Sequence, residues 1–186
     1  ADWPHSAEVT GFWFLNQDAG WQPPQSLTDF LSQGDPPVYF GFGSIFGRDP
    51  QRVTRIVMEA VRQTGVRAIF ARGWGGLVPD KAVASDSVMA IDAAPHDWLF
   101  PQVDAVVHHG GCGTTAAGLL AGEPSIICPF FGDQPFWGRC VESLGVGPPP
   151  IPQKRLGVAS LCRAIDRVVN DADMRVNAAA LGRRIR

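Results

Sequence analysis

Short apolar runs alternate with segments of helical periodicity along most of this sequence, and that alternation restricts the folds open to it. The runs that we interpret as strands are 8–14, 38–42, 66–71, 88–91, 105–107 and 125–128. The segments that we interpret as helices are 26–31, 50–64, 112–121, 134–144, 157–170 and 173–185. Strands that alternate with helices of about 10–15 residues are typical of βαβ units with parallel strands. The sequence therefore predicts an α/β fold, a Rossmann-like parallel sheet flanked by helices.

Residues at the ends of several segments support these boundaries. Pro50 suits the first turn of a helix and Gly65 suits its end. Ser26 is a candidate N-cap for the short helix 26–31. Gly122 and Gly145 are expected to end two further helices.

The composition is that of an ordinary globular domain. The chain has 186 residues, of which 45% are hydrophobic and 18% charged, and that length suits one domain. The net charge of −2 gives no electrostatic support for nucleic-acid binding. No run reaches about 18 uninterrupted apolar residues, so we expect no transmembrane segment.

The four cysteines do not suggest a metal site. They are Cys112, Cys128, Cys140 and Cys162, and no two have the C-x-x-C spacing that a four-cysteine zinc site requires. We interpret them as reduced thiols of a cytoplasmic protein. The N-terminus does not resemble a signal peptide and does not begin with Met, so we expect the chain to start inside a longer protein.

The richest candidate site is the run VVHHGGCGTTAA at 106–117. A predicted strand ends there, three glycines follow, and a predicted helix begins. The first N–H groups of a helix have no internal partner and carry the positive end of its dipole, and glycines let a ligand approach the backbone. With the hydroxyls of Thr114 and Thr115, this pattern predicts a phosphate site. The alternative is a tight turn that binds nothing.

Two histidines precede this turn. His109 lies at its mouth, where the imidazole can donate a hydrogen bond to phosphate or offset its charge. The alternative is an imidazole satisfied by the backbone at the strand end. Because side chains alternate along a strand, His108 should face the other way and be structural.

A carboxylate and an amide follow the predicted strand 125–128. In folds of this class, ligands bind beyond the carboxyl ends of the strands. Asp133 and Gln134 can therefore hold the hydroxyls of a sugar. The alternative is that Asp133 caps the helix that begins near Gln134.

Two more glycine-rich runs follow predicted strands. Ser44 lies in GFGSIFG, which matches neither the dinucleotide nor the Walker pattern, and it can donate to a phosphate or belong to a flexible turn. Trp74 lies in ARGWGG and can flank a base or anchor the core. Arg72 in the same run can meet a phosphate or pair with an acid.

Together these segments resemble one family, the nucleotide-sugar glycosyltransferases of the GT-B type. The resembling runs are FGFGS at 40–44, RGWGG at 72–76, PHDWLFP at 95–101 and the block 108–138. Within that family the runs HHGGCGTT and GDQPFWG are most similar to the sterol glucosyltransferases, and the antibiotic glycosyltransferases are similar as well.

The resemblance implies that residues 1–186 are the C-terminal domain, one half of a GT-B fold, which holds the donor, usually UDP-glucose. It assigns the diphosphate to His109, Gly111, Gly113 and Thr114, and the sugar hydroxyls to Asp133 and Gln134. The base would lie along 93–95. Plant members carry a tryptophan there that stacks on uracil, whereas this chain has Ala93, so we expect Trp74 to be the substitute.

The resemblance also implies the chemistry. The hydroxyl of a lipophilic acceptor such as a sterol attacks the anomeric carbon with inversion, after deprotonation by a base in the N-terminal acceptor domain, which is absent from this chain. No metal or other cofactor is needed if the helix N-terminus and His109 stabilise the charge on the leaving diphosphate. Asp171-Ala172-Asp173 matches the D-x-D of metal-using enzymes, but it lies far from the glycine turn, so we interpret it as a helix cap. The expected partners are a UDP-sugar, the N-terminal domain and the acceptor, and the chain alone should be inactive.

Three alternatives remain at this point. An NAD-dependent oxidoreductase would use 111–116 as G-x-G-x-x-A with Asp133 about 20 residues on, although that fingerprint usually opens the fold. A thiol hydrolase would use Cys112 with His109, although no third orienting residue is evident. A non-catalytic module would only bind or sense a nucleotide sugar.

Overall fold

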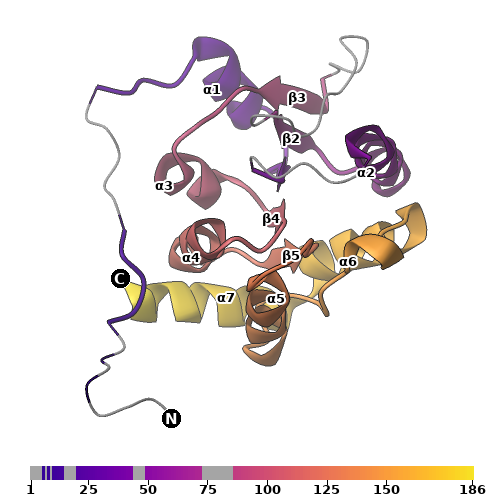
Figure 1. Cartoon of the computed structure of the whole chain (residues 1–186). Helices are drawn as coiled ribbons and strands as arrows, with labels where there is room; N and C mark the ends of the chain where they lie inside the picture. Colours follow the sequence, from indigo (N-terminus) through magenta and orange to yellow (C-terminus); the bar gives the residue numbers. More distant parts are fainter. Residues whose placement is uncertain (1–5, 7, 9, 15–19, 44–48, 73–85) are drawn as a thin grey trace.

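The protein is built around one parallel sheet (Figure 1). The computed structural model describes residues 6, 8, 10–14, 20–43, 49–72 and 86–186. The strands are β1 (Val38–Gly41), β2 (Ala68–Ala71), β3 (Val88–Ile91), β4 (Ala105–His108) and β5 (Ser125–Ile127). They lie in the order β3-β2-β1-β4-β5, and every pairing is parallel. The predicted α/β fold is confirmed.

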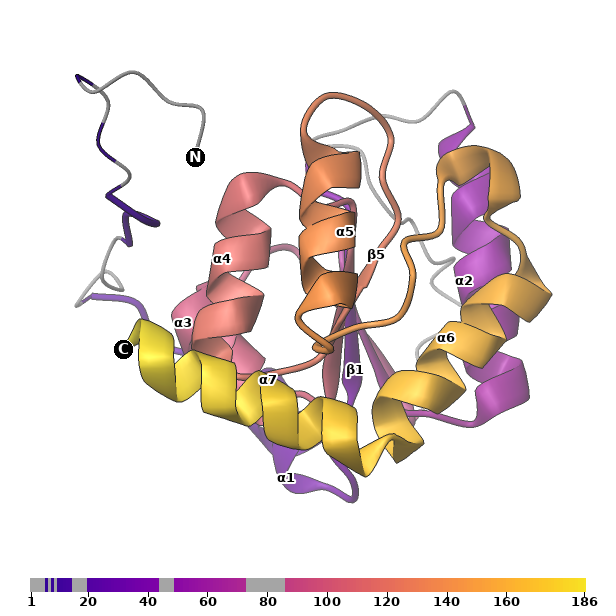
Figure 2. The same ribbon diagram turned by 90° about the horizontal axis from the view of Figure 1, so that it is seen from below.

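Helices cover both faces of the sheet. They are α1 (Gln25–Ser32), α2 (Pro50–Thr64), α3 (His96–Leu99), α4 (Cys112–Ala121), α5 (Gln134–Ser143), α6 (Val158–Asn170) and α7 (Ala172–Ile185). Two 3-10 turns, η2 (Phe100–Gln102) and η3 (Gln153–Arg155), complete the described elements. Helices α2 and α6 lie together on one side, and α3 and α4 lie on the other (Figure 1). Helix α7 runs below α4 and α5 in Figure 2 and packs on α4.

The alternation of side chains along the strands divides the core into two halves. Phe40 and Phe70 stack with centroids 5.2 Å apart on the α2/α6 face. Tyr39 and Ile69, one position earlier, are buried on the α3/α4 face with Val106. Both faces of the strands are therefore apolar, as expected when helices cover a parallel sheet on both sides.

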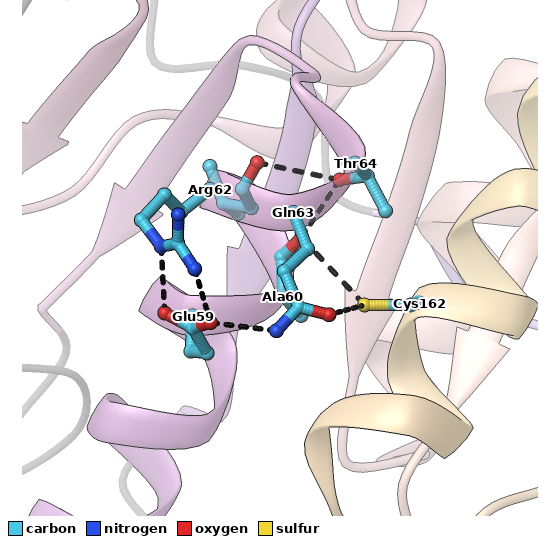
Figure 3. Close-up of polar contacts among 7 residues, drawn as sticks. Glu59, Ala60, Arg62, Gln63, Thr64 and Cys162 are labelled. Atoms are coloured by element: carbon cyan, nitrogen blue, oxygen red, sulfur yellow. Dashed lines mark hydrogen bonds and ion pairs between the residues drawn. The ribbon is translucent and has the colours of Figure 1, made fainter.

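Polar contacts line the junction of α2 with α6 (Figure 3). Glu59 accepts hydrogen bonds from Arg62 at 2.6 and 2.8 Å and from Gln63 at 2.6 Å. These bonds lower the pKa of Glu59 to about 2. Across the junction, the Cys162 sulfur lies 3.7 Å from Gln63 Oε1 and 3.9 Å from the carbonyl oxygen of Ala60 (Figure 3). The Cys162 thiol is free of a disulfide and has two acceptor oxygens on α2 within reach.

Two predictions about local structure are wrong. Helix α1 begins at Gln25 after Pro24 and no side chain caps it, so Ser26 is not its N-cap. The predicted strand 8–14 is not a strand at Glu8 or at 10–14. Instead, Phe12 packs on the apolar cluster between α4, α5 and α7. Trp13 and Phe14 of the same segment are exposed, so this apolar run does not belong to the sheet.

Candidate functional site

The sheet order places the candidate site where the chain changes its direction of winding. Strands β2 and β3 lie on one side of β1, and β4 and β5 lie on the other. Ligands of such folds bind at this switch point, beyond the carboxyl ends of the strands. Here the turn after β1 meets the turn after β4: a Cβ added at Gly43 would lie 3.1 Å from Cε1 of His109. The His109 ring therefore spans the switch point.

Three glycines build the turn from β4 into α4. Gly110 has φ of 88°, and a Cβ there would lie 2.6 Å from Ile127 Cγ2 and 3.1 Å from the Gln134 carbonyl oxygen. Gly111 is the N-cap of α4 and has no side chain with which to cap this helix end itself. A Cβ at Gly113 would meet no atom within 4 Å in the part of the chain that the structure describes, outside its own helical turn. The helix N-terminus is thus open at Gly113 and tightly enclosed at Gly110.

The two threonines of α4 have different environments. Thr115 is fully buried, and its hydroxyl donates to the carbonyl oxygen of Gly111 at 2.9 Å. The prediction that Thr115 offers a hydroxyl to the ligand is therefore wrong. Thr114 is half-buried and, with Gly113, lines a cleft of about 720 Å³ between α4 and the start of α3.

His109 is a largely buried imidazole with one nitrogen toward the turn. Its exposed fraction is 8%, its Nδ1 has no hydrogen-bond partner in the described part of the chain, and its Nε2 lies 2.5 Å from a Cβ added at Gly111. Burial lowers the pKa of His109, partly offset by the Asp133 carboxylate, so the ring is neutral at pH 7. A neutral imidazole carries one proton, and we assign it to Nε2 because an N–H at the enclosed Nδ1 would find no acceptor. The site then presents a neutral N–H donor beside the N-terminus of α4.

His108 supports the turn from the other side of β4, as predicted. Its Nδ1 accepts a hydrogen bond from the backbone N–H of Gly110 at 3.1 Å. The ring is fully buried, and this burial is the main cause that lowers its pKa to about 3, with His109 and His96 adding to the effect. His108 is neutral at physiological pH and acts structurally.

The loop after β5 brings a carboxylate to the same edge of the sheet. Asp133 is exposed and precedes α5, but its side chain does not cap this helix, so the capping alternative is wrong. Its carboxylate accepts a hydrogen bond from the indole N–H of Trp137 at 2.8 Å. Burial lowers the pKa of His109 and raises that of Cys112, and the Asp133 charge opposes the first shift and adds to the second. The carboxylate therefore lies within electrostatic reach of the glycine turn.

Gln134 holds the loop rather than facing outward freely. It is buried, and its Oε1 accepts hydrogen bonds from the N–H groups of Phe130 at 2.7 Å and Phe131 at 3.2 Å. The predicted contact of Gln134 with a sugar therefore rests on its amide nitrogen, because the oxygen is already engaged.

The remaining predicted residues lie around the cleft or outside the described chain. Ala93 is exposed just after β3, and Pro95 and His96 line the cleft opposite Gly113. Arg72 pairs with Asp92 at 3.0 Å. Ser44 and Trp74 lie outside the described residues.

The thiol-hydrolase alternative loses support here. Burial and the Asp133 carboxylate raise the pKa of Cys112, which disfavours the thiolate that a nucleophile requires.

Asp171 accepts a hydrogen bond from Met174 N at 3.0 Å and caps α7, as predicted for the D-x-D run. Within the described ranges, no group of three or more His, Cys, Asp or Glu side chains is arranged to hold a metal ion. No helix in the same ranges is both long and apolar enough to cross a bilayer.

Sequence reasoning missed Trp137. Its spacing of four residues from Asp133 was a usable signal, since side chains at i and i+4 lie on one face of a helix. No role was predicted for His96, although it lies in the run 95–101 and lines the cleft with Gly113.

The fold and the glycine turn together define the C-terminal domain of a GT-B glycosyltransferase. The chain belongs to the family described as Erythromycin biosynthesis protein CIII-like, C-terminal domain, which matches residues 53–184. The crystal structure of the glycotransferase of kitacinnamycin has the same fold, with a TM-score of 0.75 and 19% identity over 92% of this chain and 43% of that one.

Curated relatives are similar in sequence. A sterol 3-beta-glucosyltransferase of Arabidopsis thaliana is 48% identical over 91% of this chain, and one of Neosartorya fischeri is 46% identical over all of it. The chain spans 26% and 14% of the lengths of these two relatives. None of the comparisons supports the oxidoreductase alternative.

Proposed function

We propose that this chain is the donor-binding domain of a glucosyltransferase and binds UDP-glucose. The observation that carries the proposal is the uncapped N-terminus of α4 at the switch point, with the neutral Nε2–H of His109 beside it. Backbone N–H groups of this kind favour anions. Relatives at 46–48% identity that are named sterol 3-beta-glucosyltransferases support glucose as the sugar and a sterol-like hydroxyl as the acceptor.

In this proposal the donor lies along the carboxyl edge of the sheet. The diphosphate lies at the N-terminus of α4, near His109, Gly113 and Thr114. The sugar reaches toward Asp133, whose neighbour Gln134 packs on Gly110 of the turn. The base lies toward Ala93 and the cleft beside α3, where Trp74 is the expected substitute for the stacking tryptophan of plant members. Ser44 remains a candidate donor to the phosphates.

The proposed reaction is displacement at the anomeric carbon with inversion and without a metal. Negative charge grows on the diphosphate as it leaves, and fixed N–H donors stabilise such charge because they need no reorganisation. The open end of α4 and His109 supply these donors. The base and the acceptor site are proposed for an N-terminal domain of the whole protein. A cytoplasmic location fits the four free thiols.

Gly113 offers the sharpest test of the diphosphate position. Among the described residues beyond its own helical turn, a methyl group at Gly113 would meet no atom within 4 Å, so Gly113→Ala should leave the fold intact. If the diphosphate lies there, the methyl group should lower the affinities for UDP and UDP-glucose about tenfold or more, because it excludes the ligand sterically and removes hydrogen bonds to charged oxygens. The measurement is isothermal titration with UDP, UDP-glucose, dTDP-glucose and NAD in the presence of EDTA.

The outcomes separate the alternatives. Binding of UDP and UDP-glucose that Gly113→Ala and His109→Ala both weaken supports the proposal. Binding that neither substitution affects would place the ligand elsewhere, and binding of NAD alone would favour an oxidoreductase. Binding that disappears when EDTA is added would contradict the metal-independent site.

A further inference from the structure

The carboxylate of Asp133 is held by a residue that the proposed function does not use. Trp137 Nε1 donates to Asp133 Oδ2 at 2.8 Å. Asp133 precedes α5 with φ of −83° and ψ of −9°, a helical conformation. A capping residue needs extended backbone to turn its side chain onto the first N–H groups of the helix. The carboxylate therefore turns away from the helix end and meets the indole one turn further along.

The indole is itself held in place by two aromatic neighbours. The ring of Phe12 lies 5.3 Å from that of Trp137, and the ring of Phe136 lies 5.1 Å from it in an edge arrangement. Phe12 in turn packs on the apolar cluster formed by α4, α5 and α7. Trp137 is half-buried, so its ring has little freedom to rotate and its N–H is a fixed donor.

This arrangement leaves half of the carboxylate available. Oδ2 accepts from the indole, whereas Oδ1 makes no hydrogen bond to the residues that the structure describes. The group is exposed, and its neighbour Gln134 packs on the glycine turn, because a Cβ added at Gly110 would lie 3.1 Å from the Gln134 carbonyl oxygen. A charged acceptor whose orientation is fixed by one neutral donor is suited to select the direction of a second hydrogen bond.

We propose that Trp137 is a positioning residue for the donor sugar: its indole N–H orients the Asp133 carboxylate so that Oδ1 accepts a hydroxyl of the hexose. The inference rests on the proposed function, since it requires a sugar beside Asp133. Trp137 touches neither the diphosphate nor the base. Its effect is therefore confined to ligands that carry the sugar.

Titration of the 186-residue chain with UDP and UDP-glucose tests this role. Trp137→Phe keeps an aromatic ring and removes the indole N–H. It should therefore lower the affinity for UDP-glucose about tenfold and change the affinity for UDP by less than about twofold. Trp98→Phe is the matched control, because it makes the same chemical change at a half-buried tryptophan that packs on Trp21. It should change neither affinity. Trp137→His keeps a ring N–H and should recover part of the loss, which a pure packing role would not allow.

A second substitution separates this inference from the proposed function. Asp133→Ala should lower the affinity for UDP-glucose but not for UDP. In the Asp133→Ala background, Trp137→Phe should cause no further loss of UDP-glucose affinity. An unchanged UDP-glucose affinity in Trp137→Phe, or an equal loss for UDP, would overturn the positioning role while leaving donor binding intact. If the unsubstituted chain binds neither ligand, the proposed function fails and the inference fails with it.

Discussion

A methyl group at Gly111 should displace His109 without touching the ligand directly. A Cβ at this position would lie 2.5 Å from His109 Nε2 and 3.2 Å from Cε1. Carbon–nitrogen contacts settle near 3.5 Å, so the imidazole must move by about 1 Å. The moving group is a side chain, and Gly111 has φ of −62°, so the backbone can accept alanine.

The expected loss follows from the bond that His109 would make to the diphosphate. A hydrogen bond to a charged group contributes about 1.5–3 kcal/mol, which corresponds to about a 10- to 150-fold loss of UDP-glucose affinity. Alanine is also a poorer N-cap than glycine, so the variant should lose roughly 1 kcal/mol of unfolding free energy. Isothermal titration measures the first effect, and urea unfolding measures the second.

A double-mutant cycle decides whether His109 mediates the loss. In a His109→Ala background the Gly111 methyl has no imidazole to displace, so Gly111→Ala should cost less than about 0.5 kcal/mol of binding. Fully additive losses would refute the reasoning, because they would show that the methyl acts on the ligand or on the helix end itself.

Three further predictions concern packing and protonation. Gly182→Ala should lower the free energy of unfolding by about 1–3 kcal/mol, because its Cβ would lie 2.8 Å from Gly122 Cα. Thermal unfolding measures this loss of stability, and the exposed Val176→Ala is the control. Because the folded pKa of His108 is lowered to about 3, stability should fall by up to about 1.4 kcal/mol per unit as pH drops below an unfolded value of about 6.5. His108→Gln should flatten that slope in urea titrations at several pH values, and parallel curves would contradict the assignment. His109 is neutral in the free chain, and a bound diphosphate would raise its pKa. The affinity for UDP-glucose should therefore rise as the pH falls through the pKa that His109 has in the complex. His109→Gln should abolish that rise.

The sequence was most informative where the residues themselves determine the backbone. Helix α2 has the predicted ends because Pro50 fits its first turn and Gly65, with φ of 70°, stops it. Helix α3 was not predicted, since four residues show no periodicity. The segment 10–14 was predicted as strand because an apolar run looks the same whether it pairs with a strand or covers helices.

The candidate site was predictable in position but less so in its contacts. The glycine turn and His109 could be located because strand-to-helix turns of a parallel sheet share one edge. The roles of Thr115 and Asp133 depend on local geometry: one hydroxyl turns back to Gly111, and one carboxylate turns toward Trp137. Such choices follow from φ, ψ and side-chain rotamers, which composition and spacing do not specify.

The contact between Gly122 and Gly182 determines the tilt of α4, so a small change there displaces the other end of this helix. The backbones approach closely at the C-terminal end of α4, whose opposite end faces the candidate diphosphate site. Ten residues make a rod of about 15 Å, so a tilt of about 5° at the glycine contact moves the far N–H groups by about 1.3 Å. Displacements of about 1 Å at a reacting centre can reduce rates about a hundredfold. If the donor binds as proposed, a substitution on α7 would therefore change its alignment as well as the stability of the domain.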